Sequence, residues 1–164
     1  MALVSRRPWA AGRTPVAEVR KRRGRIQLHL DTDERAALLM IVEQLAPSLG
    51  QVRRTVPVAY DDPEFQAEYD RWVRPEIERS READLDVIRD CIGSGEDVTV
   101  LTEEQALAWA RGLNLLRVTA GGLMGVEEDG WEQQADDALR RSPEFRVLLA
   151  LGLIQEELIA VLEG

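Results

Sequence analysis

The chain has 164 residues, and 45% of them are hydrophobic, which is enough for a single domain to bury a core. It contains one cysteine and one histidine, Cys91 and His29, which exclude a disulfide within the chain and a zinc site built from thiolates and imidazoles. The longest apolar run, residues 147–154, is about half of what a membrane span requires. We therefore expect a soluble, cytoplasmic protein with no metal, no cofactor and no membrane contact.

Positive charge is concentrated at the start of the chain, although the net charge is −9. Residues 1–30 carry eight basic residues against Glu18 alone, so the rest of the chain has a net charge of −16. Residues 1–15 show no periodicity and are expected to form a disordered basic tail, followed by a single helical domain over residues 16–164. A basic arm on an acidic body can make weak contact with nucleic acid, or it can simply be a solvated charged surface. The candidate nucleic-acid arm consists of Arg20, Lys21, Arg22, Arg23 and Arg25.

A short β-hairpin is expected ahead of the helices. Apolar and polar residues alternate over residues 16–22 and 25–30, and Gly24 supplies the turn between them. Asp31 follows at once and has capping-box spacing with Glu34, which predicts the start of a helix.

Two further helices are predicted between residues 62 and 92. Asp62 is a favourable N-cap, and Pro63 fits the first turn because its missing N–H is not needed there. Arg74 and Pro75 interrupt this pattern, because the residue before a proline is disfavoured in a helix. The first of the two helices has an apolar face made of Phe65, Tyr69, Trp72 and Val73.

The clearest helix in the sequence covers residues 101–124 and is expected to be the central core element. Thr102 and Gln105 form a second capping box at its start. Apolar residues then recur every three or four positions, which places them on one stripe of a helix. The stripe consists of Ala106, Trp109, Leu113, Leu116, Ala120 and Leu123.

The last predicted helix begins at Ser142 and Pro143 and is apolar around most of its circumference over residues 145–162. Such a helix is expected either in the middle of a bundle or at the interface of a homodimer. The elements together predict a mainly α protein, a bundle of about five helices with a short N-terminal β-hairpin.

The sequence lacks the motifs of common catalytic sites. It contains no phosphate-binding loop and no dinucleotide-binding glycine motif, and a serine nucleophile would have His29 as its only possible base. We therefore expect a protein without catalytic residues. Polar residues near the apolar stripes predict either a structural network joining two helices or a contact with a partner or ligand. These candidates are Arg74, Asn114, Arg117 and Gln155.

Three segments occur in an order that is typical of a known family. They are DPEFQAEYDRWVRPEIERSREADL at 62–85, LTEEQALAWARGLNLLRVTAGGLMGV at 101–126 and LALGLIQEELIAVL at 149–162. Over about residues 16–162 the chain resembles the actinobacterial domain-of-unknown-function family two-thousand-seventeen.

This resemblance implies a non-enzymatic regulatory or adaptor protein. The family includes the actinomycete oxidative-stress-sensing regulators, which resemble transcription regulators that work with a sigma factor and sense oxidation through a Cys-x-x-x-Cys pair. The resemblance therefore implies a sigma factor or RNA polymerase as the partner. Cys91 has no second cysteine to pair with, so a redox role is limited to an intermolecular bridge or oxidation of the single thiol. Family genes often neighbour the gene for a Clp-protease adaptor, which makes a Clp-associated factor the alternative.

Overall fold

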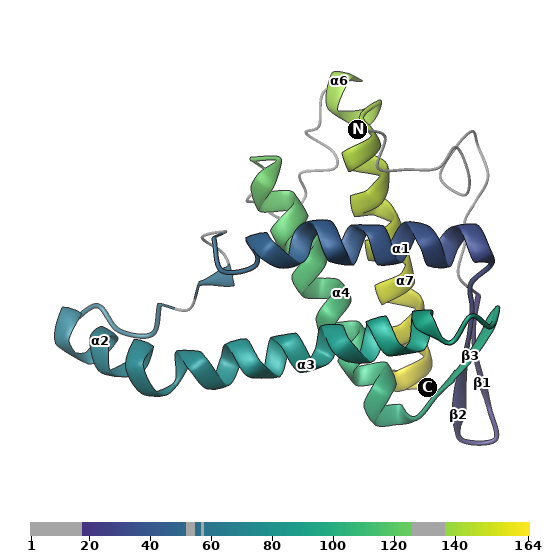
Figure 1. Ribbon diagram of the computed structural model, residues 1–164, viewed down its shortest axis with the longest axis horizontal. Helices are drawn as coiled ribbons and strands as arrows, with labels where there is room; N and C mark the ends of the chain where they lie inside the picture. Colours follow the sequence, from purple (N-terminus) through teal and green to yellow (C-terminus); the bar gives the residue numbers. More distant parts are fainter. Residues whose placement is uncertain (1–17, 52–54, 57, 126–136) are drawn as a thin grey trace.

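The computed structural model describes residues 18–51, 55–56, 58–125 and 137–164. The described part contains five helices of ten residues or more and a three-stranded sheet, which confirms the predicted mainly α fold (Figure 1). The predicted tail over residues 1–15 lies outside the described residues. The elements in chain order are β1 (Glu18–Arg22), β2 (Arg25–His29), α1 (Thr32–Leu45), the 3₁₀ helix η1 (Ala46–Ser48), α2 (Pro63–Trp72), α3 (Arg74–Gly93), β3 (Val98–Leu101), α4 (Glu103–Leu123), α6 (Asp137–Arg140) and α7 (Pro143–Glu163).

The predicted hairpin is present, and a third strand extends it. β1 pairs antiparallel with β2, and the turn between them places Arg23 at φ 52° and Gly24 at φ 75°. Two consecutive positive φ angles are typical of the tight turns that match strand twist. β2 also pairs antiparallel with β3, with Ile26 opposite Leu101. Leu101, the first residue of the stretch 101–124, therefore ends β3, and its strand was not predicted because four residues are too few for alternation to reveal a strand.

Both predicted capping boxes are confirmed. The Asp31 carboxylate accepts from the Glu34 N–H at 2.8 Å, and the Glu34 carboxylate accepts from the Asp31 N–H at 2.8 Å. Thr102 and Gln105 make the same reciprocal pair at 3.1 and 2.9 Å. Each pair satisfies two N–H groups that would otherwise lack partners at a helix start.

The interruption at Arg74 and Pro75 is confirmed, but its cause differs from the prediction. Arg74 is the first residue of α3, and Val73 keeps helical angles of φ −100° and ψ −43°. The backbone before the proline is therefore not extended. Pro75 has no N–H to donate along the helix, and this loss separates α2 from α3.

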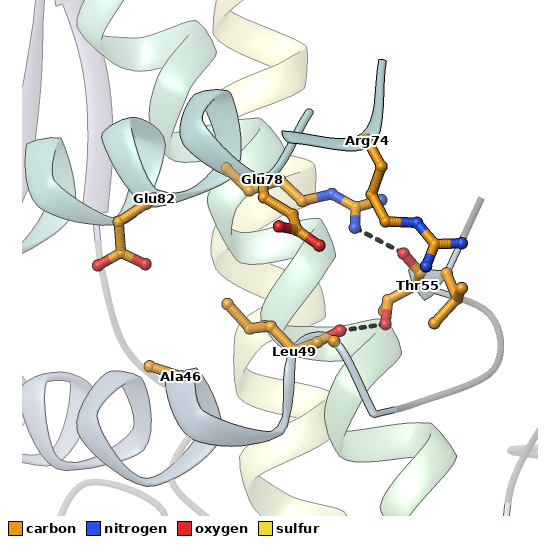
Figure 2. Close-up of a pocket in the computed structure, with 9 residues that line it drawn as sticks. Ala46, Leu49, Thr55, Arg74, Glu78 and Glu82 are labelled. Atoms are coloured by element: carbon orange, nitrogen blue, oxygen red, sulfur yellow. Dashed lines mark hydrogen bonds between the residues drawn. The ribbon is translucent and has the colours of Figure 1, made fainter. Parts of the chain in front are cut away.

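The connector after η1 is tied to α3. The Thr55 hydroxyl donates to the Leu49 carbonyl, and the Arg81 guanidinium donates to the Thr55 carbonyl at 2.5 Å. A pocket of about 160 Å³ lies between this connector and α3, with Arg74 and Glu78 on its α3 side (Figure 2). The chain is thus anchored to the bundle before it leaves towards α2.

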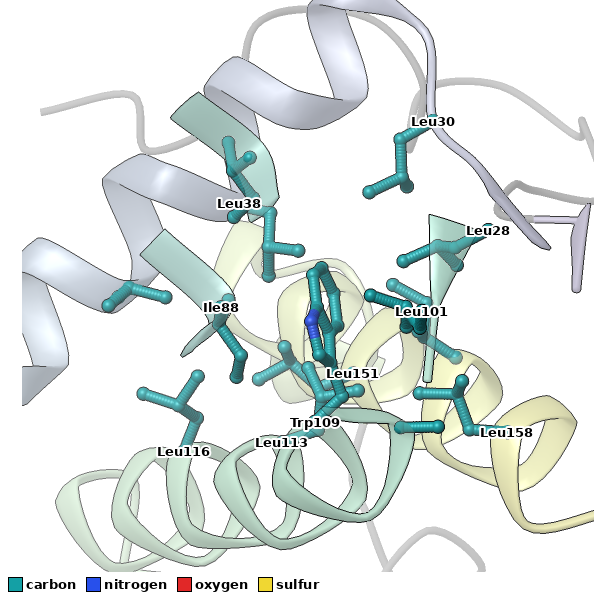
Figure 3. Close-up of a cluster of buried hydrophobic side chains, with 14 of the residues drawn as sticks. Leu28, Leu30, Leu38, Ile88, Leu101, Trp109, Leu113, Leu116, Leu151 and Leu158 are labelled. Atoms are coloured by element: carbon teal, nitrogen blue, oxygen red, sulfur yellow. The ribbon is translucent and has the colours of Figure 1, made fainter. Parts of the chain in front are cut away.

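The core surrounds Trp109 of α4, which is fully buried. Figure 3 shows its indole between Leu38 and Ile88 on one side and Leu28 and Leu101 on the other. These four side chains come from α1, α3, β2 and β3, so α4 is the central element, as predicted.

The apolar stripe of α4 is buried as predicted except at its last member. Leu123 lies on the final turn of α4, where it is 57% exposed. In Figure 1 this end of α4 extends past α1. Where α4 packs against α3, a Cβ added to Gly112 would lie 2.7 Å from the Ile88 Cδ1 atom. Gly112 therefore allows α3 to approach α4 closely.

α7 packs one face against α4 and leaves another in solvent. Leu151, Ile154 and Leu158 are buried, whereas Leu149 and Leu153 are exposed. The alternative in which α7 lies in the middle of the bundle is therefore wrong. The homodimer stays a prediction, and the exposed apolar residues of α7 that would serve it are Leu149, Leu153 and Ile159.

Candidate interaction site

Three of the four predicted polar candidates come together between α4 and α7. The Gln155 amide donates to the Asn114 Oδ1 atom at 3.3 Å, and the Arg117 Nη1 atom donates to the Gln155 Oε1 atom at 3.4 Å. Both distances are long for hydrogen bonds, so each contact is weak. Asn114 is exposed, and Arg117 and Gln155 are half-buried. The arrangement joins two helices at the rim of their interface.

Arg74 lies elsewhere. It pairs with Asp70 at 2.8 Å and lines the pocket between the connector and α3 (Figure 2). Glu78 and Glu82 line the same pocket beside Arg74 and Arg81, so its charges are mixed. The structure does not bring Arg74 into the network with Asn114.

Cys91 is half-buried on α3. Burial raises the pKa of its thiol, and the charge of Asp90 raises the pKa further. A raised pKa lowers the thiolate fraction, and the thiolate is the form that oxidants attack. The environment therefore disfavours the redox role, which stays a prediction.

The five basic residues of the candidate nucleic-acid arm lie on the β1–β2 hairpin. Strand alternation and the register place Arg20, Arg22 and Arg25 on the face of the sheet opposite to buried Ile26. Lys21 and Arg23 are exposed near the turn. Arg20 is paired with Glu18 through its Nε atom at 2.9 Å. The hairpin therefore presents a basic strip to solvent.

No group of three or more histidine, cysteine or acidic side chains within the described ranges is placed to hold a metal ion. Among the described helices, none combines the length and the apolar character needed to cross a membrane.

The most distinctive surface lies on α2, and its exposure was not predicted. We call it the aromatic patch, and none of the residues of α2 is buried. Phe65 is 61% exposed and Trp72 is 63% exposed, at the end of the molecule opposite to the sheet (Figure 1). A hollow of about 380 Å³ opens on this surface, and Glu68 contributes to its wall. The aromatic patch consists of Tyr60, Phe65, Tyr69, Trp72 and Val73.

Ring contacts and hydrogen bonds hold the aromatic patch in place. The Tyr60 ring lies 5.9 Å from the Phe65 ring and 6.2 Å from the Tyr69 ring, centroid to centroid. Both distances fall in the favourable range for tilted aromatic pairs. The Trp72 indole N–H donates to the Glu68 carboxylate at 2.9 Å. The rings therefore occupy defined positions although they are exposed.

Gln66 fixes the segment before α2 against the helix. Its Oε1 atom accepts from the N–H groups of Ala59 and Tyr60, each at 3.0 Å. Its amide nitrogen donates to Asp70 at 2.8 Å, and Asp70 pairs with Arg74. This chain of polar contacts holds Tyr60 over α2.

The surroundings of the aromatic patch are acidic. Residues 60–73 carry five acidic residues against Arg71 alone. Asp61 and Glu64 make no ion pair within the described part of the chain, whereas Arg71 lies over the Trp72 ring at 4.9 Å. An apolar surface with an acidic rim is therefore available to a partner. The sequence revealed the shared face of these residues but contained no signal that the face is uncovered.

A family model described as "Domain of unknown function (DUF2017)" matches residues 14–162. The chain belongs to the DUF2017 family. The match includes the sheet, α1 to α4, all but the last residue of α7 and the whole aromatic patch of this DUF2017 protein. No curated protein matches it, and no solved structure matches it.

Proposed function

We propose that this DUF2017 protein is a non-enzymatic regulatory or adaptor protein that binds another protein through the aromatic patch. The observation that carries the proposal is the exposure of Phe65 and Trp72 on a helix that contributes no buried residue. Contiguous exposed apolar surface on a soluble domain typically marks an interaction site. Tryptophan and tyrosine are also the residues most enriched where binding energy concentrates.

The energetics support the same proposal. Tyr60, Phe65, Tyr69 and Trp72 are four of the eight aromatic residues in the chain. Removing apolar surface from water contributes a favourable free energy of about 25 cal/mol per Å². In the isolated protein an exposed ring buries only part of its surface, so it gains only part of this free energy. A partner that covers these rings releases the remainder as binding energy.

The biological setting of the proposal comes from the family resemblance. It comprises transcription or oxidative-stress regulation in the cytoplasm, with a sigma factor or RNA polymerase as the partner. A Clp-protease-associated role is the alternative setting. The proposed binding mode requires no catalytic residue and no cofactor.

Retrieval of partners from native lysate under reducing conditions tests the proposal. Tagged full-length protein is compared with Trp72→Ala and with a matched control, Leu107→Ala, an exposed apolar residue on α4. We expect the wild type and the control to retain sigma or RNA polymerase subunits and Trp72→Ala to lose them. Retention of Clp components instead would indicate the Clp-protease-associated role. Equal retention by all three proteins would refute binding through the aromatic patch.

Nucleic-acid binding through the basic strip is a second candidate function. It is favoured by the placement of Arg20, Arg22 and Arg25 on one exposed face. Binding of this kind should weaken steeply with salt, since it releases counterions from the phosphates. We expect the triple alanine variant to lose affinity for labelled single-stranded and duplex DNA. A variant with Arg79→Ala and Arg146→Ala serves as the control, and salt-independent binding would contradict the candidate.

A further inference from the structure

We propose that the aromatic patch receives an amphipathic helix that carries lysine or arginine beside large apolar side chains. The inference rests on the proposed function, since it names the chemistry of the protein segment that this same surface binds. Three features of the described residues lead to it: the hollow, the backbone around it and the charge of its rim.

The hollow requires apolar anchors. Its volume of about 380 Å³ lies at the small end of the range for ligand sites, and rings of Tyr60, Phe65 and Trp72 line it. A space of this size accepts one or two large side chains rather than a whole folded surface. Leucine or an aromatic residue, presented at the spacing of one helical turn, fits such a site.

The backbone around the hollow excludes strand addition. The N–H groups of Ala59 and Tyr60 already donate to the Gln66 side chain. The backbone groups within α2 are satisfied along the helix. An extended peptide would find these two N–H groups already occupied, and the carbonyls that should pair with them would be left without partners. A helix satisfies its backbone internally and can therefore dock through side chains alone.

The charge of the rim selects a basic partner. Asp61 and Glu64 are exposed and make no ion pair within the described part of the chain. Cations on the docking helix would meet these carboxylates at the edge of the apolar contact, which favours rapid association and correct orientation. A second copy docking patch to patch would instead place like charges opposite each other, and nucleic acid would be repelled.

The direct test uses defined peptides with the full-length protein. The first probe is a labelled 14-residue amphipathic helical peptide of leucine and lysine, and the second replaces each lysine with glutamate. A third peptide is the first one with two of its residues replaced by proline, which prevents it from forming a helix. Fluorescence anisotropy at two salt concentrations gives the affinities. We expect the leucine–lysine helix to bind at least tenfold more tightly than either of the other peptides.

Protein variants locate this binding on the patch. Trp72→Ala should weaken the leucine–lysine helix at least tenfold. Asp61→Lys combined with Glu64→Lys should remove the preference for lysine over glutamate. The matched control, Glu156→Lys combined with Glu157→Lys on the exposed side of α7, makes the same change in net charge and should leave the preference intact. Circular dichroism confirms that each variant is folded.

The outcomes separate this inference from the proposed function. Equal, Trp72-dependent binding of the lysine and glutamate peptides would overturn the basic-helix inference and leave protein binding by the patch in place. Binding of the proline peptide as tightly as the helical one would overturn the helix. Failure of all three peptides to bind would also overturn the inference. The proposed function would then still be tested by the retrieval of partners from lysate. Self-association that is lost in the Asp61→Lys, Glu64→Lys variant would identify a second copy as the occupant.

Discussion

Trp109 and Trp72 are the same residue type in opposite environments. Trp109 is fully buried at the centre of the bundle, whereas Trp72 is 63% exposed on α2. Each lies on a helix with an identifiable N-cap and an apolar face. The difference lies in what covers that face. The sheet, α1 and α3 surround Trp109, but no described element packs over the outer face of α2 (Figures 1 and 3).

The comparison separates α3 into two halves with different roles. Its buried residues, Asp84, Leu85, Ile88 and Ile92, all lie in its C-terminal half. The N-terminal half leads outwards to α2 and contains no buried residue. Stability should therefore depend on the C-terminal half of α3, whereas the N-terminal half carries α2 away from the bundle.

The largest expected effect comes from truncating each tryptophan. Trp109→Ala should lower the free energy of unfolding by about 3–5 kcal/mol, because it leaves a cavity at the centre of the core. Trp72→Ala should change it by no more than about 0.5 kcal/mol, because that side chain is already largely in water. Urea unfolding followed by circular dichroism measures both. Equal destabilisation by the two variants would contradict the division between bundle and α2.

Two glycines provide a second contrast. Gly112→Leu should destabilise the protein by about 1–3 kcal/mol or more, since even a Cβ there lies 2.7 Å from Ile88. Gly152→Ala should be neutral or stabilising by up to about 1 kcal/mol, because its Cβ would make only ordinary contact with Arg117 at 3.7 Å. Thermal unfolding of the two variants tests the contrast. A tolerated Gly112→Leu would mean that α3 can move away from α4 at little cost.

Ion pairs sharpen the comparison further. The Arg111 guanidinium makes two hydrogen bonds to Asp84, whose side chain is only 11% exposed. Arg111→Ala should cost about 1–3 kcal/mol, because it leaves a buried carboxylate without its partner. Arg79 pairs with Glu76 where both side chains are exposed, so Arg79→Ala should cost about 0.5 kcal/mol or less. Denaturant midpoints measure both losses of stability. A larger loss for Arg79→Ala than for Arg111→Ala would contradict the greater importance of the buried pair.

The smallest expected effect concerns pH. Burial raises the pKa of the Glu34 carboxyl above its ordinary value of 4.5, against the opposing hydrogen bond from the Asp31 backbone. A carboxyl with a raised pKa in the folded protein favours folding when protonated, so its contribution falls as the pH rises from 4.5 through the raised value. Glutamine keeps the capping contact without the charge.

Glu34→Gln should therefore stabilise the protein slightly at pH 7, within about 0.5 kcal/mol, and make no difference below pH 4.5. Melting temperatures of the wild type and the variant at pH 4 and pH 7 measure this difference. A variant that is less stable than the wild type at pH 7 would show that the ionised Glu34 contributes favourably to folding.

Features set by neighbouring residues could be predicted from the sequence, and features set by distant packing could not. The capping boxes at Asp31 and Thr102 depend on residues three positions apart, so their spacing was sufficient. β3 depends on pairing with β2, which lies about seventy residues earlier, and its four residues carry too little pattern alone. The network of Asn114 and Gln155 was predicted from polar residues beside apolar stripes.

The placement of Arg74 and the exposure of the aromatic patch required the structure. An amphipathic pattern reports which side chains share a face, but it does not report what covers that face. Phe65 and Trp72 therefore gave the same sequence signal as Trp109, although only Trp109 is buried. The exposure of Leu123 has the same origin.

The position of β3 also has a consequence for how the protein is made. The β1–β2 hairpin can form as soon as its ten strand residues leave the ribosome, but β2 obtains its second neighbour only after Leu101 is synthesised. The partner of α4 on the other side, α7, comes last of all. A growing chain therefore leaves the face of α4 that packs on α7 uncovered until residues 143–163 are made. We expect chains released before residue 143 to be captured by chaperones or degraded.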